Sequence, residues 1–236
     1  MLEVSIKKRI AELVTKLENQ VKFTRNEREH LLDMFVKIGG KRSFAKLDRL
    51  KFREILHHTF HMTDDLLLDR VFRAFDYNSD GGITAKKWVV GLSIFLRGSL
   101  QERAAFTFRA YDLNSDGLIS REEMFQLLKS SLIKILPNSR KHFGLQQPTD
   151  EDPDEGIRDL VDLVMKRLDM DHDGRVTYPD FQSAVQQDAM LLEILGPCFP
   201  EEQVAVAFLS TFQEIQLPNS ICFIRPNNPA VTTKMG

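Results

Sequence analysis

Asp112-Leu-Asn-Ser-Asp-Gly-Leu-Ile-Ser-Arg-Glu-Glu123 and Asp169-Met-Asp-His-Asp-Gly-Arg-Val-Thr-Tyr-Pro-Asp180 repeat one pattern within this chain of 236 residues. Each stretch carries oxygen-bearing side chains at loop positions 1, 3, 5, 9 and 12 and a glycine at position 6. A hard divalent cation takes about six to eight oxygen ligands, and glycine makes the sharp turn at position 6 without strain. The pattern therefore predicts two calcium-binding loops.

The two loops offer similar sets of candidate ligands. In the first loop these are Asp112, Asn114, Asp116, the Leu118 carbonyl, Ser120 and Glu123. In the second they are Asp169, Asp171, Asp173, the Arg175 carbonyl, Thr177 and Asp180. Because aspartate is one methylene shorter than the glutamate that usually closes such a loop, we expect Asp180 to coordinate through one oxygen or a water. Ca2+ is the expected ion at both loops, with Mg2+ as the alternative at 169–180.

Two further units repeat this layout with fewer ligands. The segment 76–87 keeps Asp76, Asn78, Asp80, Gly81 and Thr84 in the ligand and turn positions. Lys87 replaces its closing carboxylate, which removes a ligand and repels an ion. The loop is therefore either a weak or lost calcium site or a loop kept for its shape. The segment 40–51 has Ala45 instead of the turning glycine and almost no oxygen ligands, so we expect no metal there.

A branched apolar residue at position 8 of each unit predicts a short β contact between paired loops. These residues are Leu47, Ile83, Ile119 and Val176. Apolar residues at three- and four-residue steps flank the loops, which is typical of amphipathic helices. They include Leu68, Val71, Phe72 and Phe75; Ala105, Phe108 and Tyr111; Leu160, Val161, Val164 and Leu168; Trp88, Leu92 and Phe95; Met124, Leu127 and Leu128; and Phe181 and Val185. The expected fold is all-α, of the EF-hand superfamily, with two lobes of paired helix-loop-helix units.

The predicted organisation has four parts: an N-terminal amphipathic helix at 1–25, a first lobe at 26–98, a second lobe at 99–186, and C-terminal helices and tail at 187–236. Ser99 and Glu102 have capping-box spacing after Gly98, so one helix should end near Arg97 and the next begin at Leu100.

Two features interrupt the second lobe between its loops. A stretch at about 136–151, with Pro137, Gly144 and Pro148, predicts an exposed insertion. Asp152-Pro-Asp-Glu155 then predicts the start of a helix.

Both ends of the chain carry apolar stripes. Ile6, Ile10, Leu13, Leu17 and Val21 lie on one side of the predicted N-terminal helix. The stripe either packs on its own domain or contacts a partner helix or microtubule. At the other end, a helix with Val204, Phe208 and Phe212 precedes Pro218 and the apolar patch Ile221-Cys-Phe-Ile224, a tail that either covers an apolar groove or is an ordinary disordered end.

Composition and missing motifs narrow the function. A net charge of −2 predicts no general attraction to nucleic acid. The cysteines Cys198 and Cys222 lack metal-site or disulfide-framework spacing, which favours a reducing compartment such as the cytoplasm. No apolar run is long enough to span a bilayer, and the opening Met1-Leu2 lacks the glycine needed for N-myristoylation, so we expect no membrane anchor. No nucleophile elbow or phosphate-binding glycine loop is present, so we expect no enzyme.

Segments beside the loops resemble the calaxin family, calcium sensors of ciliary outer-arm dynein. The similar stretches are Ile55-Leu-His-His-Thr-Phe-His-Met-Thr-Asp-Asp65, Asp69-Arg-Val-Phe-Arg-Ala-Phe-Asp76, Gly91-Leu-Ser-Ile-Phe-Leu-Arg-Gly-Ser-Leu100, Asp154-Glu-Gly-Ile-Arg-Asp-Leu160 and Leu191-Leu-Glu-Ile-Leu-Gly-Pro-Cys198. More distantly, the layout of four units resembles the neuronal calcium sensors. Because calcium loops occur in a very large superfamily, the flanking segments carry the resemblance.

The resemblance implies a non-enzymatic subunit of the cytoskeleton, in the axoneme of a cilium or flagellum. The implied partners are outer-arm dynein, the coiled coils of its docking complex, and the tubulin of doublet microtubules. Lys87, the insertion before Glu151 and the tail after Pro200 depart from the calaxin pattern.

Three functions remain open. The first is a regulator, whose second lobe changes conformation on binding calcium while its first lobe is a fixed docking module. The second is a constitutive docking subunit, and the third is a non-ciliary sensor of the neuronal type. For the regulator, Glu123 and Asp180 begin the helices that leave their loops, so ion binding should rotate those helices and open an apolar groove.

Overall fold

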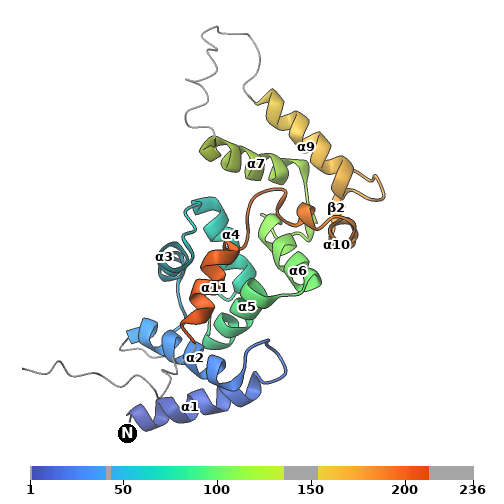
Figure 1. Cartoon of the computed structure of the whole chain (residues 1–236). Helices are drawn as coiled ribbons and strands as arrows, with labels where there is room; N and C mark the ends of the chain where they lie inside the picture. The colour runs from blue at the N-terminus through green and yellow to red at the C-terminus, as the bar shows by residue number, and fades with distance from the viewer. Residues whose placement is uncertain (1, 41–43, 136–153, 213–236) are drawn as a thin grey trace, which may run out of the picture.

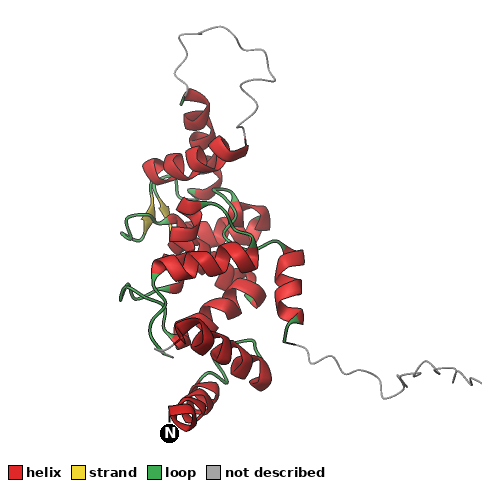
Figure 2. Cartoon of the chain, turned by 90° about the vertical axis from the view of Figure 1, so that its left-hand side faces the viewer, coloured by secondary structure: helices red, strands yellow, loops and turns green. Residues whose placement is uncertain are grey.

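Helices joined by short loops make up nearly all of the computed structural model, which describes residues 2–40, 44–135 and 154–212 (Figures 1 and 2). The helices are α1 (Leu2–Lys16), α2 (Arg25–Gly39), α3 (Arg49–Phe60), α4 (Asp65–Phe75), α5 (Ala85–Arg97), α6 (Leu100–Tyr111), α7 (Arg121–Ile135), α9 (Glu155–Leu168), α10 (Tyr178–Gln187), the 3-10 helix η2 (Ala189–Glu193) and α11 (Glu202–Ser210). The strands are β1 (Leu118–Ile119) and β2 (Val176–Thr177). The predicted insertion at 136–151 and the apolar patch at 221–224 lie outside the described residues.

The four loops meet in two pairs through their eighth positions, as predicted. Strands β1 and β2 are antiparallel, with Ile119 opposite Val176, and appear in yellow in Figure 2. In the first lobe, Leu47 and Ile83 form an isolated antiparallel bridge. All four of these side chains are buried, because each pair of loops closes over its own apolar contact. The all-α EF-hand fold is therefore confirmed.

Helix ends follow local capping signals where these are strong. The hydroxyl of Ser99 accepts a hydrogen bond from the backbone of Glu102 in a full capping box, and α5 and α6 end and begin at the predicted residues. Helix α9 begins at Glu155, and the carboxylate of Asp154 before it accepts a hydrogen bond from Lys129 of α7 at 2.7 Å. The expected cap at Asp152 lies outside the described residues.

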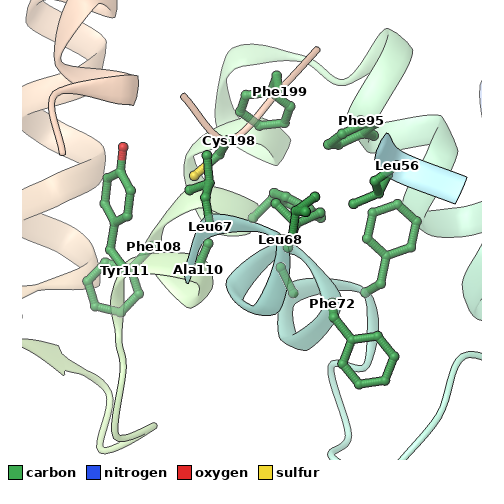
Figure 3. Packing of buried hydrophobic residues seen from close by; sticks show 14 of the residues in the cluster. Leu56, Leu67, Leu68, Phe72, Phe95, Phe108, Ala110, Tyr111, Cys198 and Phe199 are labelled. Carbon is green, nitrogen blue, oxygen red and sulfur yellow. The ribbon is translucent and has the colours of Figure 1, made fainter. Parts of the chain in front are cut away.

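Helix α6 contributes side chains from two of its faces to one continuous hydrophobic core. The Phe106 ring lies 5.7 Å from Phe75 of α4 and 6.1 Å from Phe95 of α5. On the other side of the helix, Phe108 lies 5.9 Å from Phe181 of α10. Figure 3 shows residues of α4 and α6 packed within this core. The two predicted lobes are thus joined through one shared helix.

The segment after α10 runs back from the second lobe to the first. Its Phe199 packs on the rings of Phe95 and Phe106, at 5.8 and 5.4 Å. Figure 3 labels Phe199 and Phe95. The chain then forms α11 beside α3 (Figure 1). There the Phe208 ring lies 4.9 Å from the Phe60 ring. The expected C-terminal helix is therefore present, and it covers an apolar face of the first lobe.

The N-terminal stripe packs on its own domain. Helix α1 contacts α2, and Ile10, Val14 and Leu17 are buried. The helix ends at Lys16, so Leu17 and Val21 lie beyond it.

One residue predicted to lie on an apolar helix face does not: Leu160 of α9 is 37 % exposed, because it lies outside the buried face formed by Val161, Val164 and Leu168. Among the described residues, no helix is both long and apolar enough to cross a membrane.

Candidate metal centre

Three of the loops share one backbone conformation. The glycines at position 6, Gly81, Gly117 and Gly174, have φ of 82°, 86° and 86°. These left-handed values are the reason that the sequence needs glycine there. The residues at position 4, Ser79, Ser115 and His172, are also left-handed, with φ of 52°, 63° and 62°. The sequence pattern did not predict this second left-handed position.

The aspartate at position 1 shapes each of the two predicted calcium loops. The two carboxylate oxygens of Asp112 accept hydrogen bonds from the backbone N–H groups of Asp116, at 3.1 Å, and Gly117, at 2.9 Å. The carboxylate of Asp169 accepts the corresponding two hydrogen bonds, from the backbone N–H groups of Asp173 at 3.2 Å and Gly174 at 2.9 Å. These bonds wind each loop around its first carboxylate, which is buried in both.

The loop at 169–180 gathers three carboxylates. Asp169, Asp171 and Asp173 each place one oxygen within 4.8 Å of the others. Carboxylates this close repel one another unless a positive charge lies among them. Hard oxygen donors are also the ligands that Ca2+ and Mg2+ prefer. The donor set therefore fits a divalent cation, with the Arg175 carbonyl, Thr177 and Asp180 as the remaining predicted ligands.

Glu123 connects the two ends of the loop at 112–123. Its Oε1 accepts hydrogen bonds from the backbone N–H groups of Leu113 at 2.7 Å and Asn114 at 3.1 Å. Its Oε2 accepts from the N–H and the hydroxyl of Ser120, both at 2.8 Å. The residue is 5 % exposed. The carboxylate predicted to close the site therefore lies inside the loop, beside Asp112.

Burial makes the first ligand of this loop sensitive to a nearby positive charge. The pKa of Asp112 is raised above its ordinary value by burial and further by the charge of Glu123, although backbone N–H groups of the loop oppose the shift. A cation between these two carboxylates would lower that pKa again. The remaining predicted ligands, Asn114, Asp116, the Leu118 carbonyl and Ser120, lie along the same loop.

Asp180 reaches less far than Glu123. Its Oδ2 accepts hydrogen bonds from the N–H of Thr177 at 3.0 Å and from the Thr177 hydroxyl. Within the described part of the chain, its side chain makes no hydrogen bond to the entry side of the loop, where Met170 and Asp171 correspond to Leu113 and Asn114. Because Asp180 is one methylene shorter than Glu123, its carboxylate is bonded to the exit end of the loop at 169–180 and not to the entry end, among the described residues.

The loops of the first lobe differ from these. The loop at 76–87 has the same hydrogen bonds from the N–H groups of Asp80 and Gly81 to the carboxylate of Asp76, at 3.3 and 2.9 Å. The side chain of Lys87 is buried in this loop. Of the segment at 40–51, residues 41–43 lie outside the described residues.

Two arginines that the sequence did not single out reach the third loop from α4. Arg70 and Arg73 each donate a hydrogen bond through Nη1 to the Leu113 carbonyl, at 3.0 and 2.6 Å. Burial lowers the pKa of Arg70, and the neighbouring charge of Arg73 adds to this. No local sequence signal predicts the contact, because the partners are about forty residues apart. A helix of the first lobe is therefore bonded to a predicted calcium loop of the second.

Comparisons with known proteins agree with this geometry. The family described as "EF-hand domain pair" matches residues 101–186, and the family described as "EF hand" matches residues 68–86. Calaxin of Danio rerio is 48 % identical over 207 residues, which cover 86 % of this chain and 93 % of that protein. Calaxin of Bos taurus is 44 % identical over 201 residues, covering 83 % and 89 %. Calaxin of Xenopus laevis is 43 % identical over 190 residues, covering 79 % and 86 %.

The resemblance predicted from the flanking segments is confirmed by these comparisons. EF-hand domains imply calcium as the bound ion, and identities of this size extend well beyond the loops. The chain belongs to the calaxin family of EF-hand proteins.

Proposed function

We propose that this protein is a non-enzymatic calcium sensor that regulates outer-arm dynein in cilia or flagella. Its second lobe takes up calcium through Asp112, Asn114, Asp116, the Leu118 carbonyl, Ser120 and Glu123, and through Asp169, Asp171, Asp173, the Arg175 carbonyl, Thr177 and Asp180. Family membership supports the sensor class, and the bridging position of Glu123 is the observation that carries the mechanism.

Glu123 is placed to couple its loop to a helix. It is the third residue of α7, and its carboxylate holds Leu113 and Asn114 at the start of the loop. Bound calcium would supply the positive charge that the clustered carboxylates lack. To serve the ion, Glu123 must exchange its backbone hydrogen bonds for coordination, which moves the first turn of α7. Asp180, the third residue of α10, has the same place in its own loop.

A cavity beside α7 is the surface that this movement would alter. It has a volume of about 650 Å³ and lies between α7 and α9, where Phe125 and Val161 are apolar members of its lining. Arg121 at the start of α7 forms an ion pair with Asp162 of α9 across this region. Rotation of α7 would break this pair and expose the apolar residues to a partner.

The first lobe serves in this proposal as a fixed docking module. Helix α11 already covers its α3 face, and the partners are outer-arm dynein, the coiled coils of its docking complex, and the tubulin of doublet microtubules. The axoneme is then the site of action. A constitutive docking subunit is the second candidate, favoured by the continuous core that joins both lobes through α6.

The test is a calcium titration of the purified protein in magnesium-containing buffer. Calorimetry would count the ions, and an apolar dye would report newly exposed surface, with Glu123→Gln and Asp180→Asn as matched controls that keep side-chain size. The sensor requires about two ions at micromolar affinity together with increased dye binding. Calcium binding without dye binding, or equal capture of docking-complex coiled coils with and without calcium, would favour constitutive docking. Sites held by magnesium throughout would do the same.

A further inference from the structure

The ammonium group of Lys87 lies among the oxygens of its own loop. Its Nζ donates hydrogen bonds to the Asp76 carboxylate and to the Gly82 carbonyl, the latter at 3.3 Å, and lies 2.9 Å from Oδ1 of Asp80. These residues hold loop positions 1, 7 and 5. Lys87 itself is 3 % exposed. The ammonium therefore contacts three of the oxygens that would otherwise be ligands of an ion.

The loop around this ammonium has the backbone of its metal-binding counterparts. Gly81 is left-handed at φ 82°, like Gly117 and Gly174 at 86°. Asp76 receives the same two backbone hydrogen bonds as Asp112 and Asp169. A loop that had lost its ion without replacement would leave a buried carboxylate without a counter-charge. Instead the loop keeps its shape around an internal positive charge.

The charge of Lys87 is maintained by its surroundings. Burial lowers its pKa, but the hydrogen bonds to Asp76 and Asp80 outweigh burial, and the net pKa lies above the ordinary value for lysine. Lys46 of the first unit adds a second ammonium 3.0 Å from Asp80. The hydrogen bonds from Lys87 and Lys46 lower the pKa of Asp80. An ammonium has three N–H donors and suits three such oxygens.

We propose that the ammonium of Lys87 is the resident cation of the loop at 76–87, so that the first lobe holds its ion-bound form without metal and does not respond to calcium. Lys87 lies in the first turn of α5, so its contacts also fix the start of that helix. The adjacent Trp88 is fully buried and donates its indole N–H to the Leu31 carbonyl of α2 at 3.2 Å. The arrangement of α2 and α5 is then the same at every calcium concentration. This inference rests on the loop alone and does not depend on a role in dynein regulation.

The experiment uses the full chain carrying Glu123→Gln and Asp180→Asn, so that calcium effects at the second lobe are suppressed. Lys87→Met and Lys87→Glu are added to this background, with Lys86→Met as the matched control because Lys86 is its exposed neighbour. Thermal unfolding is measured with and without calcium. The chain has a single tryptophan, so fluorescence of Trp88 reports the first lobe directly.

The background chain should show no calcium-dependent change in Trp88 fluorescence. Lys87→Met should lower Tm by roughly 5 to 10 °C without calcium, because it leaves the buried Asp76 carboxylate without its cation, and calcium should restore most of that loss. Lys87→Glu should bind one additional calcium ion per chain with a change in Trp88 fluorescence. Calcium binding at the loop 76–87 of the background chain, which still carries Lys87, would overturn the proposal. So would a Lys87→Met variant as stable without calcium as Lys86→Met.

Discussion

The Leu113 carbonyl accepts a hydrogen bond from Arg73 at 2.6 Å, which joins the third loop to helix α4 of the other lobe. The N–H at the other end of the same peptide group, that of Asn114, donates a hydrogen bond to Oε1 of Glu123 at 3.1 Å. One peptide group is thus held between an arginine of the first lobe and the carboxylate that is proposed to close the calcium site. Helix α4 of the first lobe thus restrains the peptide that Glu123 holds, and the strength of this contact should affect ion binding at the loop 112–123.

Replacing Arg73 by methionine should tighten calcium binding at the loop 112–123 by roughly twofold to tenfold. The change removes a positive charge near the proposed site and frees the peptide that restrains Glu123. The free energy of unfolding without calcium should fall by about 1 kcal/mol, because Arg70 still donates to the same carbonyl. Calorimetric titration and urea denaturation measure the two effects. Arg25→Met, on the exposed face of α2, is the control and should change neither; unchanged affinity in Arg73→Met would exclude the coupling.

Exchanging the lengths of the closing carboxylates should exchange the properties of the two calcium loops. Asp180→Glu should raise calcium affinity at 169–180 by about tenfold and its preference over magnesium, because the longer side chain can coordinate through both oxygens. Glu123→Asp should weaken the other loop by a similar factor. Competition titrations of calcium against magnesium check both. Equal magnesium binding in Asp180→Glu and the parent chain would contradict the length argument.

Tyr111 joins α6 to the segment that leads back to the first lobe. Its hydroxyl donates to the Gly196 carbonyl at 2.7 Å, while its ring packs on Phe181. Tyr111→Phe should lower the free energy of unfolding by about 1 to 2 kcal/mol, because a part-buried carbonyl loses its donor while the buried ring remains. Urea denaturation with an unchanged slope is the expected readout. Tyr77→Phe, at a hydroxyl on an exposed residue, is the control; equal losses in both variants would rule out this role for the contact.

The contribution of Glu102 to the free energy of unfolding should depend on pH and be lost in acid. Its hydrogen bond from Lys22 is the main cause of a pKa lowered to about 2, with the Ser99 backbone contributing. A carboxyl whose pKa is lower in the folded state stabilises above its unfolded pKa of about 4.5 and loses this contribution as the pH falls toward about 2. The side chain is 44 % exposed, so solvent screening limits the effect to about 1 kcal/mol.

Glu102→Gln should therefore narrow the stability difference between about pH 6 and pH 3 relative to the parent chain. Denaturant titrations at a series of pH values measure this difference. High salt should reduce the effect, because the ion pair is partly exposed. Identical pH dependence of the two proteins would show that Lys22 does not stabilise the charged form of Glu102.

Phe208 is the main anchor of α11 on the first lobe. It is the buried residue of that helix, and its ring contacts Phe60 of α3 and Phe212. Phe208→Ala should raise amide hydrogen exchange throughout α11 by at least about tenfold, because little other burial holds the helix. The control is Val206→Ala, whose side chain is 59 % exposed. Unchanged protection of α11 in the Phe208 variant would show that the helix is held by other contacts.

The conformation and pairing of the EF-hand loops were predictable from the sequence because the interactions that set them are local. Ligand spacing, the left-handed glycine and the capping box at Ser99 all act within about a dozen residues, so they are visible as patterns of residue types. Leu160 was assigned wrongly because periodicity places residues on a helix but does not set the width of its buried face. The expectation that Asp180 coordinates through one oxygen or a water stays a prediction; the structure shows its carboxylate bonded to Thr177, whereas the carboxylate of Glu123 also reaches Leu113.

The sequence was enough to determine the paired loops, their flanking helices and the loss of the closing ligand at Lys87. The tertiary structure was needed to show that α6 serves both lobes, that α11 returns to α3, that Arg73 reaches Leu113, and that the Lys87 ammonium enters its loop. The physical reason is the range of the interactions. Backbone turns and ligand spacing are set by neighbouring residues, whereas packing and buried ion pairs depend on which surfaces the folded chain brings together.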